Sequence, residues 1–483
     1  MNKPVTPATE EAKTRMAAVL EIQRRANIAK GAPSALARKD RLNRAISLLV
    51  AHQDDFIAAL SADFGARSPD MSRLTDIAGA IGPLKYARDN LEAWMRPQRR
   101  KVSPAPLAVL GGKAEVRFQP KGVVGVMTPW NFPVQLSFDA IAGAFAAGNR
   151  VMLKPSEFTP ATSALMAQTL DLFFDEDEVA VIQGGPEVGA AFAALPFDHL
   201  IFTGATSVGR HVMRAAAENL TPVTLELGGK SPVVIGADAD IAKTAARVMA
   251  GKTMNAGQIC LAPDYVLAPR ESVDGFVSAA KASVAKMYPT IKDNPDYTAM
   301  IAQRHYDRVR GYVEDARAKG AEVVELNPAG EDFSQQEHRK IPPTLILNAT
   351  DEMTVMQEEI FGPVLPIRAY TSFEAAIAEI NARPRPLAAY YFGENEAESE
   401  ALITRTTSGG VTVNDVIFHF TMDDLPFGGV GPAGMGAYHG KRGFQEFSHE
   451  KAIYRQIRPD ILAMMRPPYG EAFRKQVAAR LKP

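Results

Sequence analysis

The stretch HLIFTGATSVGRHVMRAAAENL, residues 199–220, combines a short apolar run, a glycine turn and a segment with helical spacing of its apolar residues. Gly204 and Gly209 have the outer spacing of the dinucleotide fingerprint G-x-G-x-x-G, with Thr206 at the middle position. A helix that starts here would present free backbone N–H groups to a pyrophosphate. An ordinary strand-to-helix turn is the alternative. The usual search for a ribose-binding acid about 20 residues further on points to Glu226.

Short apolar runs and amphipathic segments alternate on both sides of this stretch. The runs GVVGVMTP, NRVMLKP, VAVIQGG, TPVTLEL and SPVVIGA each end near Gly or Pro and are interpreted as buried strands. Amphipathic segments such as TPATSALMAQTLDLFF separate them, which is typical of a parallel sheet covered by helices. A second α/β region follows Gly228 and continues to about Arg405. The sequence therefore predicts an α/β protein.

The two ends of the chain differ from this pattern. From Glu10 to about Met95, apolar residues recur at three- and four-residue intervals, which predicts helices. RPQRRKVSP, residues 96–104, breaks the periodicity and is interpreted as a surface linker. Nine glycines fall within residues 409–443, a density that indicates close backbone approach or many tight turns.

Length and charge limit what the protein can bind. A chain of 483 residues predicts about three domains. The 54 Lys and Arg residues balance 55 Asp and Glu residues, so no global field attracts nucleic acid or an anionic membrane surface. No apolar stretch approaches the length of a membrane span. The eight histidines lack metal-ligand spacing, so no bound metal is expected. The expected partner is a small molecule or another copy of the chain.

The chain contains one cysteine, Cys260, in the stretch GQICLAPDY. Because it cannot form an intramolecular disulfide, we expect a cytoplasmic location. A solitary cysteine is most often a small buried apolar residue. A loop position after a helix that ends at Gly257 would instead display Cys260 as a nucleophile. The stretch by itself leaves both interpretations open.

Three further segments place polar groups in apolar or rigid settings. In VTLELGGKSPVV, burial of Glu226 would raise its pKa and suit a general base, although a pairing with Lys230 is an equal alternative. In PWNFPV, the amide of Asn131 could be an oxyanion donor, worth roughly 10² to 10³ in rate, or an Asx-type turn residue. In QEEIFGPVLPI, residues 357–367, the paired acids could hold a ribose or begin a strand edge.

Seven segments, in this order and over nearly the whole chain, resemble signatures of the aldehyde dehydrogenase superfamily. They are PWNFPV, KPSEFTP, FTGATSVG, LELGGKSP, GQIC, EEIFGPVLP and LPFGGVG. GQICLAPDYVL, GGVTVNDV and MGAYHGKRGFQEFSH further resemble the class 3 branch, of which the bacterial coniferyl aldehyde dehydrogenases look like a similar subgroup. The resemblance implies NAD(P)-dependent oxidation of an aldehyde to a carboxylic acid.

The resemblance also implies roles for individual residues. Cys260 would be the nucleophile, and its backbone N–H would stabilise the oxyanion together with the amide of Asn131. Glu226 would activate the water that hydrolyses the thioester, in place of binding a ribose. Lys154 and Glu157 of KPSE would contact the ribose on the adenosine side. Because a carboxylate at Glu157 suits a ribose 2′-hydroxyl and repels a 2′-phosphate, NAD is expected to be preferred and NADP less favoured.

The remaining cofactor contacts are expected near the pyrophosphate and at the nicotinamide end. They are Gly204, Thr206, Ser207 and Gly209 at the helix start, Glu359 at the nicotinamide ribose and Phe361 beside the nicotinamide. The implied architecture is a variant Rossmann cofactor domain (1–103 and 118–227), an α/β catalytic domain (228–408) and a small oligomerisation element with a C-terminal tail (104–117 and 409–483). The tail resembles the class 3 extension that favours dimers, so a homodimer is expected.

Apolar residues beside Asn131 and in VIFHF predict an aromatic or medium-chain apolar aldehyde, with a coniferyl-aldehyde-like substrate favoured. A CoA-acylating dehydrogenase is one alternative, but such enzymes generally lack a base at the position of Glu226. A non-catalytic nucleotide-binding or structural descendant is another. It would predict loss of Cys260, Glu226 or Asn131, and the chain retains all three.

Overall fold

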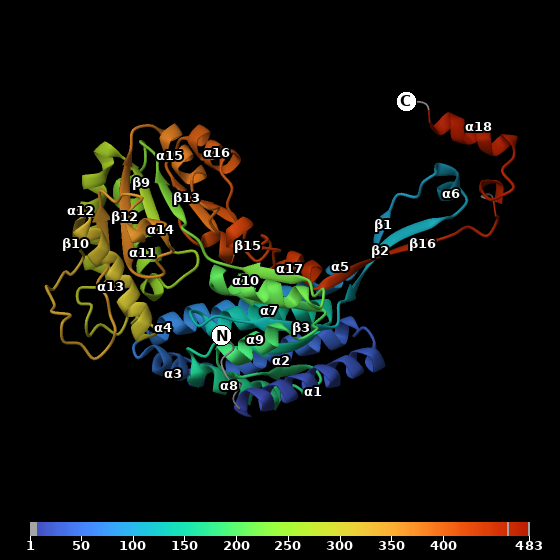
Figure 1. Ribbon diagram of the computed structural model, residues 1–483, viewed down its shortest axis with the longest axis horizontal. Coiled ribbons are helices and arrows are strands. Elements are labelled where there is room, and N and C mark those ends of the chain that lie inside the picture. The colour runs from blue at the N-terminus through green and yellow to red at the C-terminus, as the bar shows by residue number, and fades with distance from the viewer. Residues whose placement is uncertain (1–6, 461–462, 482–483) are drawn as a thin grey trace. The chain divides into compact units, whose positions relative to one another are not determined.

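The computed structural model describes residues 7–460 and 463–481, which belong to two compact units (Figure 1). Unit 1 comprises Met1–Trp94 and Pro120–Ser448, and unit 2 comprises Met95–Gln119 and His449–Pro483. The predicted cofactor domain includes residues 1–6, and the predicted tail includes residues 461–462 and 482–483; these lie outside the described residues. Within the described ranges, no helix is long and apolar enough to cross a membrane.

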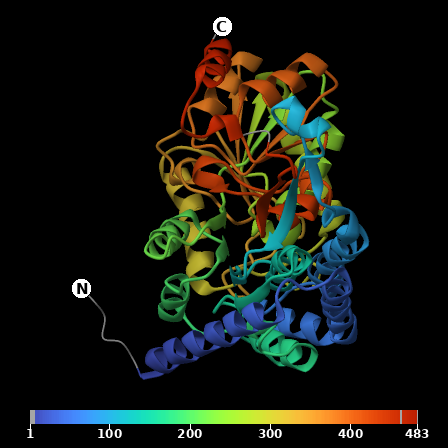
Figure 2. The same ribbon diagram turned by 90° about the vertical axis from the view of Figure 1, so that its right-hand side faces the viewer.

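Unit 1 begins with helices, which confirms the prediction for residues 10–95. They are α1 (Pro7–Lys30), α2 (Ala35–Ala51), α3 (Gln53–Phe64), α4 (Pro69–Ser72), a π-helical turn (Arg73–Ala78) and α5 (Gly79–Trp94). The apolar side of α2, including Leu42 and Leu49, is fully buried. In both views of the molecule these N-terminal helices, drawn in blue, lie together on the side of unit 1 that holds its six-stranded sheet (Figures 1 and 2).

The six-stranded sheet has the strand order β15-β7-β6-β3-β4-β5. Its strands are β3 (Val123–Met127), β4 (Arg150–Lys154), β5 (Val179–Val181), β6 (His199–Thr203), β7 (Val223–Glu226) and β15 (Gly434–Met435). Only β15 is antiparallel to its neighbour. The helices that connect the parallel strands are α7 (Pro133–Ala147), α8 (Pro160–Phe173), α9 (Pro186–Ala193) and α10 (Thr206–Ala217). Since the strands are parallel, Lys154, Thr203 and Glu226 end at one edge of the sheet.

The second sheet of unit 1 has seven strands in the order β10-β11-β12-β9-β8-β13-β14, and only β10 is antiparallel. The strands are β8 (Pro232–Ile235), β9 (Tyr265–Pro269), β10 (Glu322–Glu325), β11 (Thr344–Leu347), β12 (Val364–Tyr370), β13 (Ala388–Phe392) and β14 (Gly410–Val413). The accompanying helices are α11 (Ile241–Thr253), α12 (Val273–Met287), α13 (Gln303–Ala318), α14 (Thr354–Gln357), α15 (Phe373–Asn381) and α16 (Glu396–Arg405). Both predicted α/β regions are therefore confirmed.

The glycine-dense segment returns to the first sheet, where β15 pairs with the end of β7. A Cβ atom added at Gly434 would lie 2.1 Å from the carbonyl oxygen of Leu225, and one at Gly429 would lie 2.0 Å from that of Ala433. Side chains are excluded at both positions because two backbone segments are in contact. Close backbone approach, predicted from the glycine density, is confirmed here. The segment continues into α17 (Gly440–Glu446).

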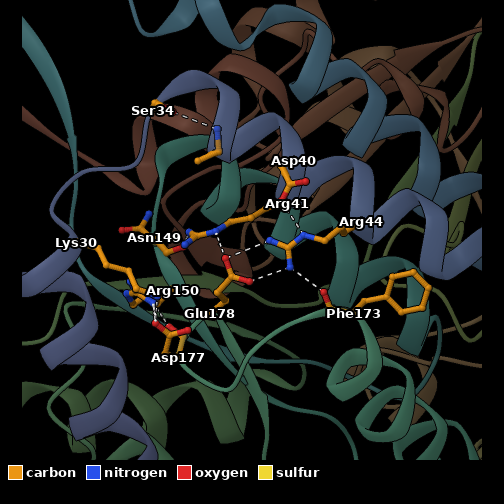
Figure 3. Close-up of polar contacts among 11 residues, drawn as sticks. Lys30, Ser34, Asp40, Arg41, Arg44, Asn149, Arg150, Phe173, Asp177 and Glu178 are labelled. Carbon is orange, nitrogen blue, oxygen red and sulfur yellow. Dashed lines mark hydrogen bonds and ion pairs between the residues drawn. The ribbon is translucent and has the colours of Figure 1, made fainter.

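A partly buried network of charges connects the N-terminal helices to the first sheet (Figure 3). Arg41 and Arg44 of α2 both point toward Glu178, at 2.8 Å each, just before β5. Arg150 at the start of β4 pairs with Asp177 at 3.0 Å. Burial acts to raise the pKa of Glu178, but the two arginines outweigh it and hold the pKa below its ordinary value. The carboxylate therefore stays ionised and keeps α2 attached to the sheet.

Unit 2 is built around the small sheet β1-β2-β16. Its elements are β1 (Gln98–Arg100), α6 (Ala105–Val109), β2 (Lys113–Pro120), β16 (Ser448–Arg455) and α18 (Glu471–Arg480). The predicted surface linker at residues 96–104 is thus wrong in part, because residues 98–100 pair with β2 as an antiparallel strand. This strand is three residues long, polar and mostly exposed, so it leaves no apolar signal in the sequence. The predicted domain limits stay predictions; the limit at residue 227 falls between β7 and β8.

Candidate active site

A cleft of about 1100 Å³ in unit 1 is lined by segments that follow strands of both large sheets. Eight of the predicted site residues line it, namely Asn131, Gly204, Thr206, Ser207, Glu226, Cys260, Glu359 and Phe361. Lys154, Glu157 and Gly209 lie outside this lining. Residues that are up to 230 positions apart in the chain therefore meet around one cavity.

Cys260 lies on a turn directly after α11 and a short 3-10 turn (Met254–Gly257). Asn255, Ala256 and Gly257 all have left-handed backbone angles, with φ of 49°, 51° and 71°. Non-glycine residues adopt this region at a cost, and such backbone strain often occurs at functional sites. The turn ends the helix abruptly and leaves the Cys260 side chain partly exposed on the cleft. The loop position inferred for a nucleophile is confirmed.

The thiol of Cys260 is held in its neutral form. Burial and the charges of Glu359 and Glu226 raise its pKa to about 12, although the backbone N–H groups of Cys260 and Leu261 act in the opposite direction. A thiol in this setting needs a base to remove its proton before it can attack a carbonyl.

Glu226 is the last residue of β7 and is 2% exposed. Burial, and then the charge of Glu446, raise the pKa of its carboxyl well above the ordinary value. Neither carboxylate oxygen has a hydrogen-bond partner in the described part of the chain. The alternative pairing with Lys230 is wrong, because Lys230 instead bonds Asp264 and the carbonyl oxygens of Val355 and Glu358, the latter two at 2.7 and 2.9 Å. A raised pKa and free oxygens are the properties of a general base.

Asn131 lies two residues before α7 and is 3% exposed. Its side-chain nitrogen donates to the carbonyl oxygen of Gln258 at 3.1 Å, two residues before Cys260. An amide has two N–H donors, so one is left for an oxyanion. The carbonyl oxygen of Asn131 accepts from Arg67 at 3.1 Å and from Asn255 at 3.2 Å. These bonds fix the amide against the Cys260 turn.

A buried ion pair supports the Asn131 segment from behind. Arg67 and Asp76 are both fully buried and lie 2.6 Å apart. Asp76 also accepts from the backbone N–H groups of Val134 and Gln135 at 3.2 and 3.4 Å, so it caps α7, whose own N-cap residue lacks a side-chain bond. Sequence reasoning missed this pair, because the helical pattern of residues 10–95 carries no signal for a contact with α7.

Glu359 lies against the turn that follows Glu226. A Cβ atom added at Gly228 would lie 2.0 Å from a Glu359 carboxylate oxygen. Burial and the charge of Asp264 raise the pKa of Glu359 to about 8, in spite of a bond from the Gly229 backbone. Its other oxygen, Oε1, is buried and has no hydrogen-bond partner among the residues that the structure describes. An orphaned carboxylate oxygen on the cleft fits a ribose hydroxyl donor.

The start of α10 fits a phosphate group. Its N-cap residue is Ala205, which has no side-chain acceptor, so the first-turn N–H groups at Thr206 and Ser207 are not capped by a side chain. Gly209 faces the sheet, where an added Cβ would lie 2.7 Å from Leu227. Its observed role is to let α10 approach the end of β7.

Lys154 ends β4 at the same sheet edge, two strands away from Thr203. Its ammonium group donates to Glu157 at 3.3 Å and to the carbonyl oxygen of Pro155 at 3.0 Å. Burial lowers the pKa of Lys154, and Glu157 acts against this. Glu157 is exposed and can receive a hydroxyl group from the side of solvent.

A helix start open to a phosphate and a thiol on the same cleft are features of an oxidoreductase that works through a cysteine. The chain belongs to the aldehyde dehydrogenase family, whose profile matches residues 3–453. It is an NAD(P)-dependent aldehyde dehydrogenase, which oxidises an aldehyde to a carboxylic acid. The predicted resemblance and activity are confirmed.

Individual relatives are similar over nearly their whole length. The chain is 63% identical to a probable coniferyl aldehyde dehydrogenase of Caulobacter vibrioides, with all of both chains covered, and 53% identical to a coniferyl aldehyde dehydrogenase of a Pseudomonas species, with 95% and 94% covered. A substrate-bound structure of Staphylococcus aureus AldH superimposes with a TM-score of 0.90 at 34% identity, covering 97% and 99% of the two chains. A Mycobacterium tuberculosis aldehyde dehydrogenase with NAD+ gives 0.82 at 30% identity, covering 93% and 92%. The predicted fold class is confirmed.

Proposed function

We propose that this aldehyde dehydrogenase oxidises coniferyl-aldehyde-like substrates, that is, aromatic aldehydes with an apolar body. The identity of 63% to a protein named as a probable coniferyl aldehyde dehydrogenase supports this substrate class. A series of aromatic side chains near the Cys260 turn supports it as well. The hydroxyl of Tyr390 donates to the carbonyl oxygen of Leu261 at 2.6 Å, and rings of His419 and Phe427 follow in contact. Aromatic rings favour an aromatic substrate through offset and edge contacts.

We propose that Cys260, Glu226 and Asn131 perform the reaction. Glu226 accepts the thiol proton of Cys260, and the sulfur then bonds to the aldehyde carbon. The resulting oxyanion accepts hydrogen bonds from the Asn131 amide and from the Cys260 backbone N–H. When a dinucleotide is held in the cleft, it would supply the hydride acceptor, and loss of the hydride from the carbon leaves a thioester on Cys260. After Glu226 has released the thiol proton to solvent, it takes a proton from the water that adds to the thioester, and it returns this proton to the Cys260 sulfur as the carboxylic acid leaves.

The single observation that carries this assignment is the state of Glu226. Its two oxygens are buried and unpaired, its pKa is raised, and its charge affects Cys260. Such a carboxylate is a stronger base than an exposed one, and its free oxygens can accept a hydrogen bond from a water molecule. A CoA-acylating enzyme would have no use for it.

For the cofactor, we propose that Lys154 and Glu157 bind the ribose on the adenosine side, that the start of α10 binds the pyrophosphate at Gly204, Thr206 and Ser207, and that Gly209 acts through packing. Glu359 would bind the nicotinamide ribose, with Phe361 beside the ring. Because Glu157 would repel a 2′-phosphate, NAD is preferred over NADP in this proposal. Equal kcat/KM values for the two coenzymes would refute the preference.

We propose a homodimer that uses unit 2. The three-stranded small sheet and the tail form this unit, which exposes Val109, Leu110 and Tyr454. Exposed apolar side chains of this kind suit a protein interface. Light scattering should give the mass of a dimer, and a single sharp tetramer mass would overturn this part. A cytoplasmic location, expected from the single cysteine, stays a prediction.

The reaction is tested by following NADH with coniferaldehyde, with and without CoA. The wild type should form NADH independently of CoA, and Cys260→Ala should form none. Glu226→Gln should give a burst of NADH followed by slow turnover. In this variant the thiol proton of Cys260 can still pass to water while the thioester forms once, whereas every hydrolysis of the thioester needs Glu226 as the base. Glu358→Gln is a matched control, since this carboxylate also lines the cleft but is exposed and bonded to Tyr312. An unimpaired steady state in Glu226→Gln would move the role of base elsewhere.

A further inference from the structure

Asp139 of α7 and His439 at the start of α17 form a buried polar pair that the proposed reaction does not use. Their side chains are 1% and 4% exposed, and His439 Nε2 lies 3.6 Å from Asp139 Oδ2, longer than a hydrogen bond. Both carboxylate oxygens and both ring nitrogens lack a hydrogen-bond partner among the described residues. Buried polar groups rarely lack hydrogen bonds. Here the Asp139 carboxylate lacks a donor, and the ring N–H of His439 lacks an acceptor. His439 also has a φ of 75°, a backbone conformation that is costly for a non-glycine residue.

A continuous row of aromatic rings connects this pair to the Cys260 turn. Tyr390, which bonds the carbonyl oxygen of Leu261, lies 6.3 Å from the ring of His419, and His419 lies 6.4 Å from Phe427. Phe427 stacks on His439 at 5.2 Å. Burial raises the pKa of the hydroxyl of Tyr438, beside His439, and the charges of Asp139, Glu226 and Cys260 act in the same direction, so Tyr438 is within electrostatic range of all three. The pair therefore belongs to the surroundings of the reacting thiol.

The position of Asp139 along α7 can be compared with the length of an aromatic aldehyde. Asp139 is six residues after Pro133, which corresponds to about 9 Å along the helix axis. Asn131, the proposed oxyanion donor, lies just before the start of this helix. Along the helix, Asp139 is therefore about as far from its start as the distal ring position of a phenylpropenal is from the carbonyl oxygen.

The charge around the pair selects the kind of ligand. Burial raises the pKa of Asp139, and His439 acts against this. Asp423, half-buried nearby, has its pKa raised by burial and by the charge of Asp139. Two carboxyl groups would repel an anion and favour a neutral hydrogen-bond donor. Walls formed by Phe420, at 4.8 Å from His439, and by Phe427 suit an aromatic ring that carries the donor.

We propose that Asp139 and His439 form a subsite that binds the ring hydroxyl of a hydroxyaryl aldehyde. The hydroxyl donates to the Asp139 carboxylate and accepts from the ring N–H of His439, which satisfies both orphaned groups. This inference rests on the proposed function, because it assigns the distal end of the substrate whose aldehyde reacts at Cys260. Asp139 acts as a specificity-determining residue and takes no part in the bond changes.

The test compares kcat/KM for 4-hydroxycinnamaldehyde, 4-methoxycinnamaldehyde and cinnamaldehyde. The methoxy compound keeps the ring and the oxygen but lacks the donor. The wild type should prefer the hydroxy over the methoxy compound by about 10- to 100-fold, the range for one hydrogen bond to a charged acceptor. Asp139→Leu should reduce this ratio to about one. Equal wild-type rates with all three aldehydes would overturn the subsite and leave the proposed function intact, whereas no oxidation of any would refute the function itself.

Two further variants distinguish loss of the subsite from a folding defect in Asp139→Leu. Asp139→Asn exchanges the charged acceptor for a neutral one of the same shape, and it should lower the ratio at least about threefold. Asp424→Asn is the matched control, because Asp424 is an exposed carboxylate of the same region that accepts from Tyr86 at 2.9 Å. Its ratio should equal that of the wild type. An unchanged ratio in Asp139→Asn, or an equal loss in Asp424→Asn, would overturn the proposal.

Discussion

Replacing Asp76 by Asn should destabilise the protein more than any exposed change of the same kind. Asp76 and Arg67 have no side-chain exposure and lie 2.6 Å apart. Burial raises the pKa of Asp76 and lowers that of Arg67, although each acts to keep the other charged. The pair is therefore ionised only because both members are present. Without the carboxylate, a guanidinium is left buried with no counter-charge.

The expected cost follows from this burial. Loss of one partner of a buried ion pair costs about 3–5 kcal/mol, because the other charge stays desolvated. The N–H groups of Val134 and Gln135 both donate to Asp76 Oδ1, at 3.2 and 3.4 Å, so the amide oxygen of Asn can retain these two bonds while the contact with Arg67 is lost. Arg67 also donates to the carbonyl oxygen of Asn131, so a displaced guanidinium should slow the reaction as well. We expect a lower free energy of unfolding together with a lower kcat.

Urea unfolding followed by tryptophan fluorescence measures this cost, since Trp130 lies beside Asn131. The matched control is Asp54→Asn, which breaks the Arg73–Asp54 pair at 2.8 Å. Those side chains are 48% and 82% exposed, so the cost should stay below about 1 kcal/mol. The double variant Arg67→Met with Asp76→Leu should recover most of the stability, because it leaves no buried charge. If Asp76→Asn costs no more than Asp54→Asn, the reasoning is wrong.

Three further predictions concern Glu359. Gly228→Ala would place a Cβ 2.0 Å from its carboxylate, so the KM for NAD should rise about 10- to 100-fold, the worth of one charge-assisted bond; an unchanged KM would remove Glu359 from the cofactor site. Glu359→Gln should speed alkylation of Cys260 by iodoacetamide at alkaline pH, because its charge raises the thiol pKa, and a slower reaction would contradict this. The pKa of Glu359 is about 8 in the folded protein against an ordinary 4.5, so folded Glu359 keeps a proton that the unfolded chain releases. The free energy of unfolding should therefore fall as the pH rises between these values. Glu359→Gln should flatten this dependence in urea titrations at several pH values.

Local patterns were sufficient for most of the fold. Apolar runs that end in Gly or Pro predict strands because a buried parallel strand needs apolar side chains on both faces. Glu226, Cys260 and Asn131 could be found because each lies where a strand or helix ends, next to a residue that fixes the turn. At such ends, residues that are adjacent in sequence are also adjacent in space, so a local pattern was enough to propose these three residues.

Contacts between distant segments were beyond the reach of such patterns. Lys230 lies four residues from Glu226, which made a local pair plausible, yet the Gly228–Gly229 turn carries Lys230 away to Asp264. Asp139 and His439 are 300 positions apart, and the motif that contains His439 gives no indication of its contact with Asp139. The strand at residues 98–100 exists because β2 pairs with it, and its own sequence is charged. Each of these features depends on a partner that only the folded chain brings near.

The pairing of β15 with β7 has a consequence for the growing chain on the ribosome. Gly434 lies opposite Glu226, and the N–H of Leu227 donates to the carbonyl oxygen of Ala433 at 3.0 Å. Until the last tenth of the polypeptide has been synthesised, β7 is therefore an edge strand with open backbone groups, the kind of edge that invites aggregation. The strand that ends in the proposed base gains its second neighbour almost last. A nascent chain that ends before Gly434 therefore depends on rapid completion of synthesis or on a chaperone to protect that edge.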